Sequence, residues 1–588
     1  MAGGALSRVQ ETVTVPRGIA LVRRLFRSSE AALVAMAVAL GIAAGLLTYV
    51  LNKVAHGLQS LIYGLGGSSL SAAQSVSWES LLALPVGGLI LGFGSREAVR
   101  RWRTPVDVVE ANALHGGAIP WRDTVLVCVQ TLLSNGVGAS VGLEAAYAQA
   151  GGGFASIVGQ WLRLRRADMR ILLGAGAGAA IGAAFSAPLT GAFYAFEIVI
   201  GAYTPAAIAP VAAASLSAVL TARLLGLEAY IIALPGAKAI TTDDYLIYAA
   251  LGVICAAIAV TIMRIVTFLE ERIRGSALIE VLRPAVGGLL LIPLALITPQ
   301  VLSAGHGALH IDLGAEVGLR FLLLIFVLKV AASSISLGFG FRGGLFFASL
   351  FIGSLAGQLF AGALARISGA PPIDPSDAAL IGMAAMAVSI VGGPMTMSLL
   401  VLETTHDFTL TGVAVTAGLC ASTVVRETFG FSFSTWRMHT RGQSIRSARD
   451  VGWIRNLTVG KMMQRATETA TAEITIAEFR RRFPLGSTAN VVLTDRTAKY
   501  FGIVDTSRAF EASLDKDLEI GTLAIMKDIV LSPSEDVRHA MRTFDIHGAD
   551  FLAVIDDSGE VIGTLSEKFV HRRYTDEMEK AQREIFGE

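Results

Sequence analysis

The stretch Gly136-Val-Gly-Ala-Ser-Val-Gly-Leu-Glu144-Ala-Ala-Tyr-Ala-Gln-Ala-Gly-Gly-Gly153 decides the fold. It places one carboxylate, Glu144, between apolar segments of membrane character. An ionisable group inside a bilayer costs at least about 2.5 kcal/mol, so its default interpretation is functional. A helix beginning near Gly142 points bare N–H groups and a positive dipole end at this place, which predicts an anion site built from backbone. The alternative is a glycine-rich packing seam with a glutamate at a helix start.

Composition indicates a polytopic membrane protein. Of the 588 residues, 53% are hydrophobic and 16% are charged, whereas soluble domains carry about 25% charged residues. The net charge of +1 gives no reason to expect a nucleic-acid partner. Cys128, Cys255 and Cys420 stand singly in apolar runs, which predicts buried free thiols. The nine histidines have no metal-ligand spacing, so no metal site is expected.

The chain divides into a membrane part and a soluble part. Arg23, Arg24 and Arg27 precede the first apolar run, and positive charge marks the inner side of a membrane. Both termini are therefore expected in the cytoplasm, with the protein in the cell (inner) membrane. The predicted parts are a cytoplasmic segment (1–29), a membrane domain (30–436, with halves at about 30–226 and 243–427), a basic linker (437–457) and a cytoplasmic α/β pair of helix–strand–strand units (458–585).

The membrane part repeats internally. Gly142-Leu-Glu-Ala-Ala resembles Gly344-Leu-Phe-Phe-Ala, and Pro188 precedes Glu197 by the spacing with which Pro394 precedes Glu403. Duplicated halves with broken helices predict a transporter fold whose substrate lies at the repeat interface near the midplane. The two glycine turns then meet, and two converging helix N-termini favour an anion over a cation.

These segments resemble the CLC chloride channels and chloride–proton exchangers over residues 30–440, and the C-terminal pair resembles CBS domains. The resemblance implies an all-α polytopic membrane domain with an inverted repeat and short broken helices. It also implies a homodimer in the lipid bilayer, a small anion as the transported ion, and no cofactor for transport. The matching motifs are Gly142-Leu-Glu144-Ala-Ala, the stretch from Ala184 to Glu197, Gly344-Leu-Phe346-Phe-Ala348, and the stretch from Gly393 to Glu403.

The resemblance assigns Glu144 as the gating glutamate, whose carboxylate competes with chloride and moves on protonation. Thr104 lies in the stretch aligned with the family's serine-bearing motif, and the pore tyrosine falls at Phe433 or Ser434. These departures leave the preferred anion open. The anion-binding positions that the resemblance implies are Gly142, Leu143, Ala145, Gly344, Leu345 and Phe346, with Thr104, Phe433 and Ser434 as further candidates.

One departure bears on mechanism. Ile198 stands where the family's exchangers carry an internal proton-transfer glutamate, and it cannot carry a proton. Passive, channel-like conduction is therefore favoured over proton-coupled antiport. Glu197 and Glu403 are interpreted as structural groups that satisfy local backbone donors, with a proton path as the alternative.

A third hypothesis makes the CBS-like pair a ligand-sensing regulator on a non-transporting membrane domain. Asp505, Thr506 and Ser566 occupy turns where the resemblance places ribose or phosphate, so an adenine nucleotide is a candidate ligand. The alternative is a dimerising module. An enzyme is not expected, because the spans carry no nucleophile–base pair.

Overall fold

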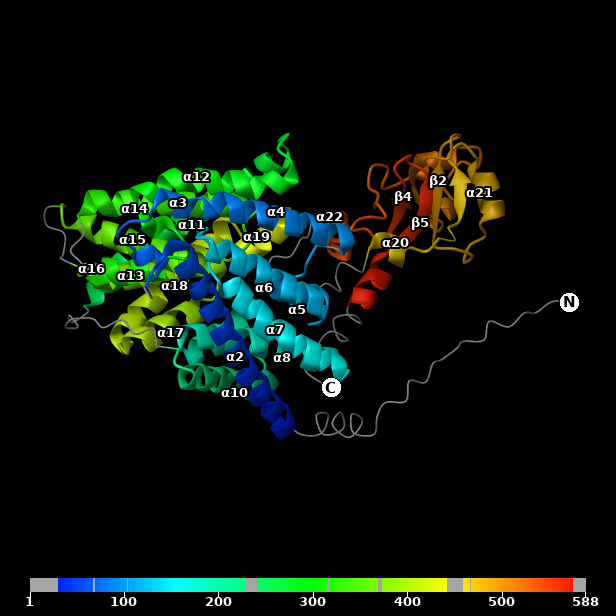
Figure 1. Ribbon diagram of the computed structural model, residues 1–588. Coiled ribbons are helices and arrows are strands. Elements are labelled where there is room, and N and C mark those ends of the chain that lie inside the picture. The colour runs from blue at the N-terminus through cyan, green and yellow to red at the C-terminus, as the bar shows by residue number, and fades with distance from the viewer. Residues whose placement is uncertain are drawn as a thin grey trace. The chain divides into compact units, whose positions relative to one another are not determined.

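The computed structural model describes residues 30–66, 69–102, 104–227, 241–314, 318–367, 373–440, 458–465 and 467–574. The chain forms two compact units, Met1–Asp450 and Val451–Glu588. The first unit is helical and the second combines helices with small sheets (Figure 1). The predicted cytoplasmic segment and most of the predicted linker lie outside the described residues. Helix α19 (Phe433–Thr440) continues into the range predicted as linker.

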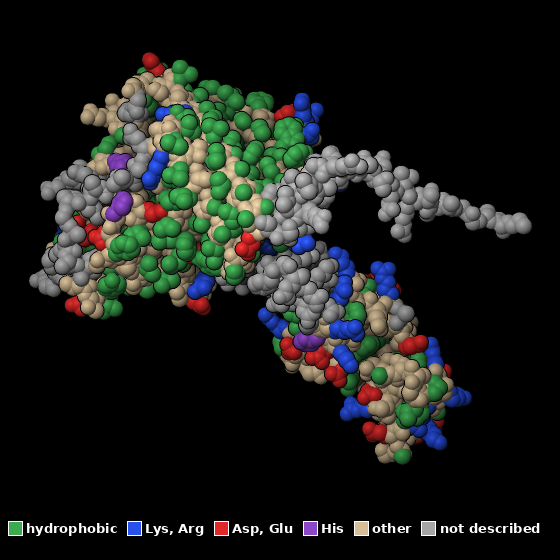
Figure 2. Space-filling view, turned by 90° about the horizontal axis from the view of Figure 1, so that it is seen from below, with side chains coloured by type: hydrophobic (Ala, Val, Ile, Leu, Met, Phe, Trp, Pro, Cys, Tyr) green, Lys and Arg blue, Asp and Glu red, His purple; other side chains and the backbone are tan. Residues whose placement is uncertain are grey.

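The first unit is a polytopic membrane domain. Nine helices among the described residues are long and apolar enough to cross a membrane. Figure 2 shows few charged side chains on one face of this unit, and many on the C-terminal unit. Its first half contains α2 (Glu30–Tyr63), α3 (Trp78–Leu81), α4 (Ala83–Arg101), α5 (Val108–Leu114), α6 (Trp121–Gly136), α7 (Glu144–Trp161), α8 (Arg166–Phe185), α9 (Pro188–Tyr194) with its continuation η2 (Ala195–Ile200), and α10 (Pro205–Leu224).

The second half has the same succession of long and broken helices. Two of its helices begin at a side-chain cap: Asp374 and Asp407 accept hydrogen bonds from the first turns of α16 and α18. The helices are α11 (Thr242–Arg274), α12 (Arg283–Ile297), α13 (His306–Gly314), α14 (Leu319–Gly338), α15 (Phe346–Leu364), α16 (Pro375–Val391), α17 (Pro394–Thr405), α18 (Phe408–Thr428) and α19, with the short turns η3 (Glu280–Leu282) and η4 (Pro299–Val301). The short turn η1 (Leu70–Ala72) belongs to the first half, between α2 and α3.

Within each half, glycines bring one pair of helices into close contact, and the pairs occupy equivalent positions in the two halves. A β-carbon at Gly151 of α7 would lie 2.2 Å from the carbonyl oxygen of Gly176 in α8. A β-carbon at Gly353 of α15 would lie 2.4 Å from the carbonyl oxygen of Gly382 in α16. Small residues allow such backbone approach in lipid, where no hydrophobic force drives helices together. The matching pairs are what the predicted repeat requires.

The C-terminal unit holds two copies of one helix–strand–strand unit, as predicted. In the first copy, β1 (Thr469–Thr471) runs parallel to β2 (Asn490–Thr494), which pairs antiparallel with β3 (Tyr500–Asp505). In the second, β4 (Phe551–Ile555) pairs antiparallel with β5 (Val561–Ser566), and both hairpins shift register near the end of their first strand. The helices are α20 (Val459–Met462), α21 (Ile476–Arg482) and α22 (Val537–His547).

All three cysteines are free, as the sequence predicts. Cys128 and Cys255 are buried, but the prediction of burial is wrong for Cys420, which is half-buried. Cys420 follows Leu419, which is 48% exposed, so this side of α18 lies at the surface of the unit.

Candidate functional site

The two glycine turns predicted to meet lie side by side. Gly142 N–H donates to the Gly344 carbonyl at 3.0 Å, and Gly344 N–H donates to the Gly142 carbonyl at 3.3 Å. Helix α7 begins two residues after the first glycine and α15 begins two residues after the second. Neither helix start receives a hydrogen bond from the side chain of its N-cap residue, Leu143 or Leu345. Two sets of bare N–H groups and two positive dipole ends therefore share one place, which suits an anion.

The Glu144 carboxylate occupies the space between these turns. Its side chain is buried, at 4% exposure, and it accepts backbone hydrogen bonds from Glu144 itself and from Phe347 of α15. Its Oε2 has no hydrogen-bond partner among the residues that the structure describes. An added β-carbon would lie 1.8 Å from Oε2 at Gly142 and 3.5 Å from it at Gly344. The carboxylate thus takes the position that the paired helix starts offer to a small anion.

Serine side chains from α14 hold the turn before Glu144. Ser140 N–H donates to Ser336 Oγ at 3.0 Å, and the hydroxyls of Ser140 and Ser333 lie 3.0 Å apart. Asn135 Nδ2 donates to the Val141 carbonyl at 2.8 Å. The two serine contacts join the halves, so the position of the first glycine turn depends on the second repeat.

A buried lysine fixes the loop next to this turn, which the sequence analysis did not anticipate. Lys329 of α14 is fully buried, and its Nζ donates to the carbonyls of Val301 at 3.2 Å and Ser303 at 2.8 Å. The Ser303 hydroxyl accepts from Gln59 at 3.2 Å and from Asn135 at 3.1 Å. The ammonium is therefore bound to backbone carbonyls rather than to a carboxylate, and it stabilises the network around the Glu144 turn.

Glu197 and Glu403 cap helices of the opposite half. Glu403 accepts from the backbone N–H groups of Leu189 at 2.7 Å and Thr190 at 2.8 Å, at the start of α9. Glu197 accepts from Met395 at 3.2 Å and Thr396 at 2.8 Å, at the start of α17. Each carboxylate also accepts from the threonine hydroxyl at 2.7 Å. The contacts match the structural interpretation of both residues.

The other predicted pore residues lie apart from Glu144. The side chains of Thr104 and Ser434 are exposed, and no described contact connects either with the Glu144 turn. Phe433 is buried at the start of α19, with the Arg437 guanidinium carbon 5.6 Å from its ring centroid. Ile198 lies half-buried in η2. The residues that the structure does bring together at the helix starts are Gly142, Leu143, Ala145, Gly344, Leu345 and Phe346.

In the C-terminal unit, the predicted nucleotide residues lie at the ends of hairpins. Asp505 Oδ1 accepts a hydrogen bond from Ser507 N–H at 2.8 Å, so this carboxylate stabilises the turn in which it lies. Thr506 is buried, and its Oγ1 has no hydrogen-bond partner in the described part of the chain. Ser566 ends β5 at the position equivalent to Asp505. Among the described residues, the cluster able to hold a metal ion is the largely exposed group Asp545, Glu567 and His571.

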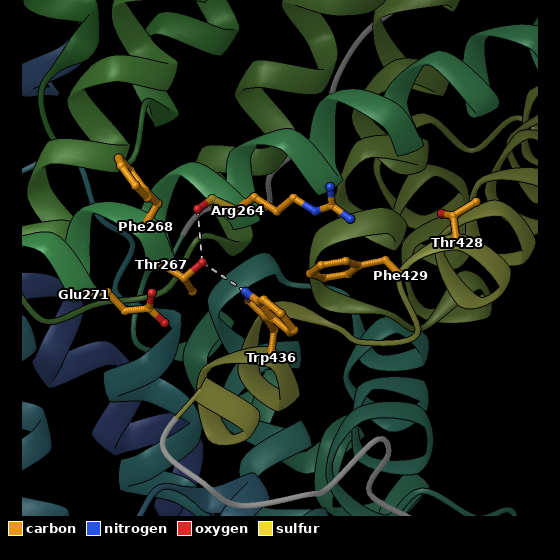
Figure 3. Close-up of a pocket in the computed structure, with 7 residues that line it drawn as sticks. All are labelled: Arg264, Thr267, Phe268, Glu271, Thr428, Phe429 and Trp436. Atoms are coloured by element: carbon orange, nitrogen blue, oxygen red, sulfur yellow. Dashed lines mark hydrogen bonds between the residues drawn. The ribbon is translucent and has the colours of Figure 1, made fainter.

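A separate pocket of about 420 Å³ lies at the C-terminal ends of α11 and α18 and at α19. Figure 3 shows Arg264 extended toward Phe429, with the guanidinium carbon 5.6 Å from the ring centroid. Trp436 Nε1 donates to Thr267 Oγ1 at 3.1 Å. No residue predicted for the site lines this pocket, which is completed by Phe268, Glu271 and Thr428.

Comparison with known proteins places most of the membrane unit in one family. The model described as voltage gated chloride channel matches residues 87–426. A ClcB-like chloride channel protein of Ralstonia nicotianae is 28% identical over 385 residues, which cover 64% of this chain and 89% of the relative. The voltage-gated ClC-type chloride channel ClcB of Escherichia coli O157:H7 is 27% identical over 394 residues, covering 64% of this chain and 91% of the relative.

Two solved structures share the fold. A slow cyanobacterial Cl⁻/H⁺ antiporter matches 70% of this chain and 97% of its own, with a TM-score of 0.61 and 22% identity. A eukaryotic CLC transporter matches 93% of this chain and 98% of its own, with a TM-score of 0.59 and 18% identity. The second match extends through the C-terminal unit.

Proposed function

The chain belongs to the voltage-gated chloride channel family, and we propose that it carries chloride across the membrane with Glu144 as the gate. One observation carries this proposal: the Glu144 carboxylate lies between two helix starts that no N-cap side chain satisfies. A carboxylate resembles the permeant anion in charge, so it competes for a site of positive potential. A proton on Glu144 removes that competition and opens the site to chloride.

Passive, channel-like conduction is the favoured mode. Ile198 cannot carry a proton toward Glu144, and the curated relatives are named chloride channels. Proton-coupled chloride antiport is the second candidate, favoured by the fold shared with a Cl⁻/H⁺ antiporter. Nitrate and fluoride are also small anions, so both are alternative substrates for this site.

Flux into liposomes tests both modes. We expect chloride flux through the reconstituted protein to rise on acidification, because protonated Glu144 leaves the site. The Glu144→Gln variant should conduct at every pH, while the exposed Glu79→Gln control should behave as the parent. Reversal potentials measured with chloride, nitrate and fluoride give the selectivity. A chloride gradient that drives protons uphill would establish antiport, and identical flux in parent and Glu144→Gln would contradict the gate.

We further propose that the protein is a homodimer in the inner membrane, with its termini and C-terminal unit in the cytoplasm. In this arrangement the CBS-like pair regulates transport by binding an adenine nucleotide. The buried Thr506 hydroxyl without a partner is the feature that favours a ligand there. Isothermal titration of the purified full chain with ATP tests this, and Thr506→Val should weaken binding if the hydroxyl contacts the nucleotide.

A further inference from the structure

Tyr194, at the end of α9, lies beside the start of α15. Its side chain is only 8% exposed, and its ring centroid lies 6.2 Å from that of Phe346, the first residue of α15. The ring of Phe185 lies 5.2 Å from Phe346 on the same aromatic cluster. The phenol is therefore next to one of the two bare helix starts that hold Glu144.

The Tyr194 hydroxyl forms no hydrogen bond with any residue that the structure describes. Two other tyrosines of the membrane unit do have partners: the half-buried Tyr63 donates to the Val137 carbonyl at 2.7 Å, and the hydroxyl of the buried Tyr147 accepts from Asn52 at 3.3 Å. The buried Tyr248 resembles Tyr194, since its hydroxyl also forms no hydrogen bond with a residue that the structure describes. The Tyr194 hydroxyl is not one of the fully buried polar atoms that lack a partner, so it is accessible to a small ligand although most of the side chain is buried. The missing partner of Tyr194 is best supplied by something that the pathway carries.

The surrounding charges limit what that partner is. Tyr194 lies within electrostatic range of the carboxylates of both Glu144 and Asp107. The Asp107 carboxylate is committed to capping α5, where it accepts from Glu110 N–H at 2.8 Å. An anion near two carboxylates needs hydrogen-bond donors around it. The phenol O–H of Tyr194 supplies one donor, in addition to the bare N–H groups of Leu345 and Phe346.

We propose that the Tyr194 hydroxyl is a direct ligand of the transported anion, at a position beside the start of α15. The proposal rests on the proposed function, since it needs an anion to pass through this site. It makes Tyr194 a determinant of which anion is preferred. One O–H donor together with backbone N–H groups suits a small, monovalent, hydrogen-bond-accepting anion.

The Tyr194→Phe variant of the full chain tests the proposal, because it removes the hydroxyl and keeps the ring. We expect chloride affinity, measured by calorimetry on the purified protein, to fall about tenfold, which corresponds to about 1.4 kcal/mol. Tyr248→Phe is the matched control, since Tyr248 is also buried but lies on α11, where its charged neighbours are Asp244, Asp374 and Asp377. Its chloride affinity should equal that of the parent.

An unchanged chloride affinity in Tyr194→Phe overturns the proposal, and so does a variant that loses only proton-linked flux. Parent protein that binds no anion would instead overturn the proposed function, and the two failures are distinguishable. If Tyr194→Phe does not fold, bromide bound to the parent provides a second measurement. An anomalous peak within hydrogen-bond distance of the hydroxyl supports the proposal, and bromide found only elsewhere along the pathway overturns it.

Discussion

Gly142 leaves no room for any side chain, since a β-carbon there would lie 1.8 Å from Glu144 Oε2. We therefore expect Gly142→Ala to push the Glu144 carboxylate out of its place between the helix starts. Chloride flux should lose most of its rise on acidification, because the gate no longer competes with the anion. Thermal unfolding should show a loss of about 1–3 kcal/mol, typical of overpacking. Liposome flux and the unfolding midpoint measure the two effects.

Gly94→Ala is the control for this substitution. Gly94 lies in α4, and an added β-carbon there meets nothing within 4 Å. Its flux and its pH dependence should match those of the parent. Pronounced gating in Gly142→Ala with a normal unfolding midpoint would mean that the carboxylate does not rest where the structure places it.

At the scale of elements, Glu403 caps the start of α9 and Glu197 caps the start of α17. Each half of the membrane unit therefore caps a helix of the other half. Replacing either Glu403 or Glu197 with alanine removes the acceptor of three hydrogen bonds, two from backbone N–H groups and one from a threonine hydroxyl. We expect each substitution to cost about 0.5–2 kcal/mol of stability, the usual range for a lost cap. The midpoint of thermal unfolding measures this, with exposed Glu427→Ala as the control.

The same variants separate a structural role from a proton path. With a structural role, the ratio of protons to chloride moved stays that of the parent in Glu197→Ala, while stability falls. A changed ratio with an unchanged unfolding midpoint would assign Glu197 to proton transfer and contradict the capping argument.

The two hairpins of the C-terminal unit carry equivalent acid-sensitive turns. Hydrogen bonds from Thr497 and Lys499 lower the pKa of Asp495, and bonds from Ser558 and Glu560 lower that of Asp556. A lowered pKa means that the stabilisation is complete above the ordinary value of 3.8 and is lost as the pH falls through the lowered value. We expect Asp495→Ala with Asp556→Ala to destabilise this unit at neutral pH and to converge with the parent in acid. Calorimetric scans of the full chain at several pH values provide the measurement, and an equal deficit at all pH values would contradict it.

Sequence reasoning succeeded where a repeat and a rare residue coincide. The meeting of Gly142 and Gly344 follows from duplicated glycine turns, and a lone carboxylate in apolar surroundings marks Glu144. The buried positions of Lys329 and Tyr194 could not be predicted in the same way. Helices α14 and α9 are apolar on most sides, so periodicity does not reveal which face is turned inward. Placing a side chain on such a helix requires knowledge of its neighbours, which the chain supplies from distant segments.

The candidate pore hydroxyls illustrate the same limit. Thr104 and Ser434 were assigned by alignment across stretches where this chain departs from the family's motifs, and both side chains are exposed. An alignment is least informative where the motif itself is missing. Tyr194, the proposed donor beside α15, lies on another helix, so the spacing of residues along the chain carried no signal for it.

For the whole molecule, the separation of hydrophobic cores decides what the C-terminal unit contributes. Among the described residues, the hydrophobic clusters of the membrane unit extend to Met438, and the two cores of the C-terminal unit begin at Val459. Each unit therefore buries its own apolar surface. We expect a chain ending at Asp450 to fold and to carry chloride at the rate of the full chain, because every residue of the Glu144 site lies within the first unit.

The full chain and the chain ending at Asp450 should differ in their response to a nucleotide. If the CBS-like pair senses an adenine nucleotide, ATP should alter chloride flux in liposomes only when the full chain is present. The truncated chain is then the control for direct effects of ATP on the membrane unit. A truncated protein that is folded by size-exclusion and thermal criteria but transports no chloride would show that the C-terminal unit takes part in conduction itself. Equal ATP responses in both chains would instead place the nucleotide site in the membrane unit.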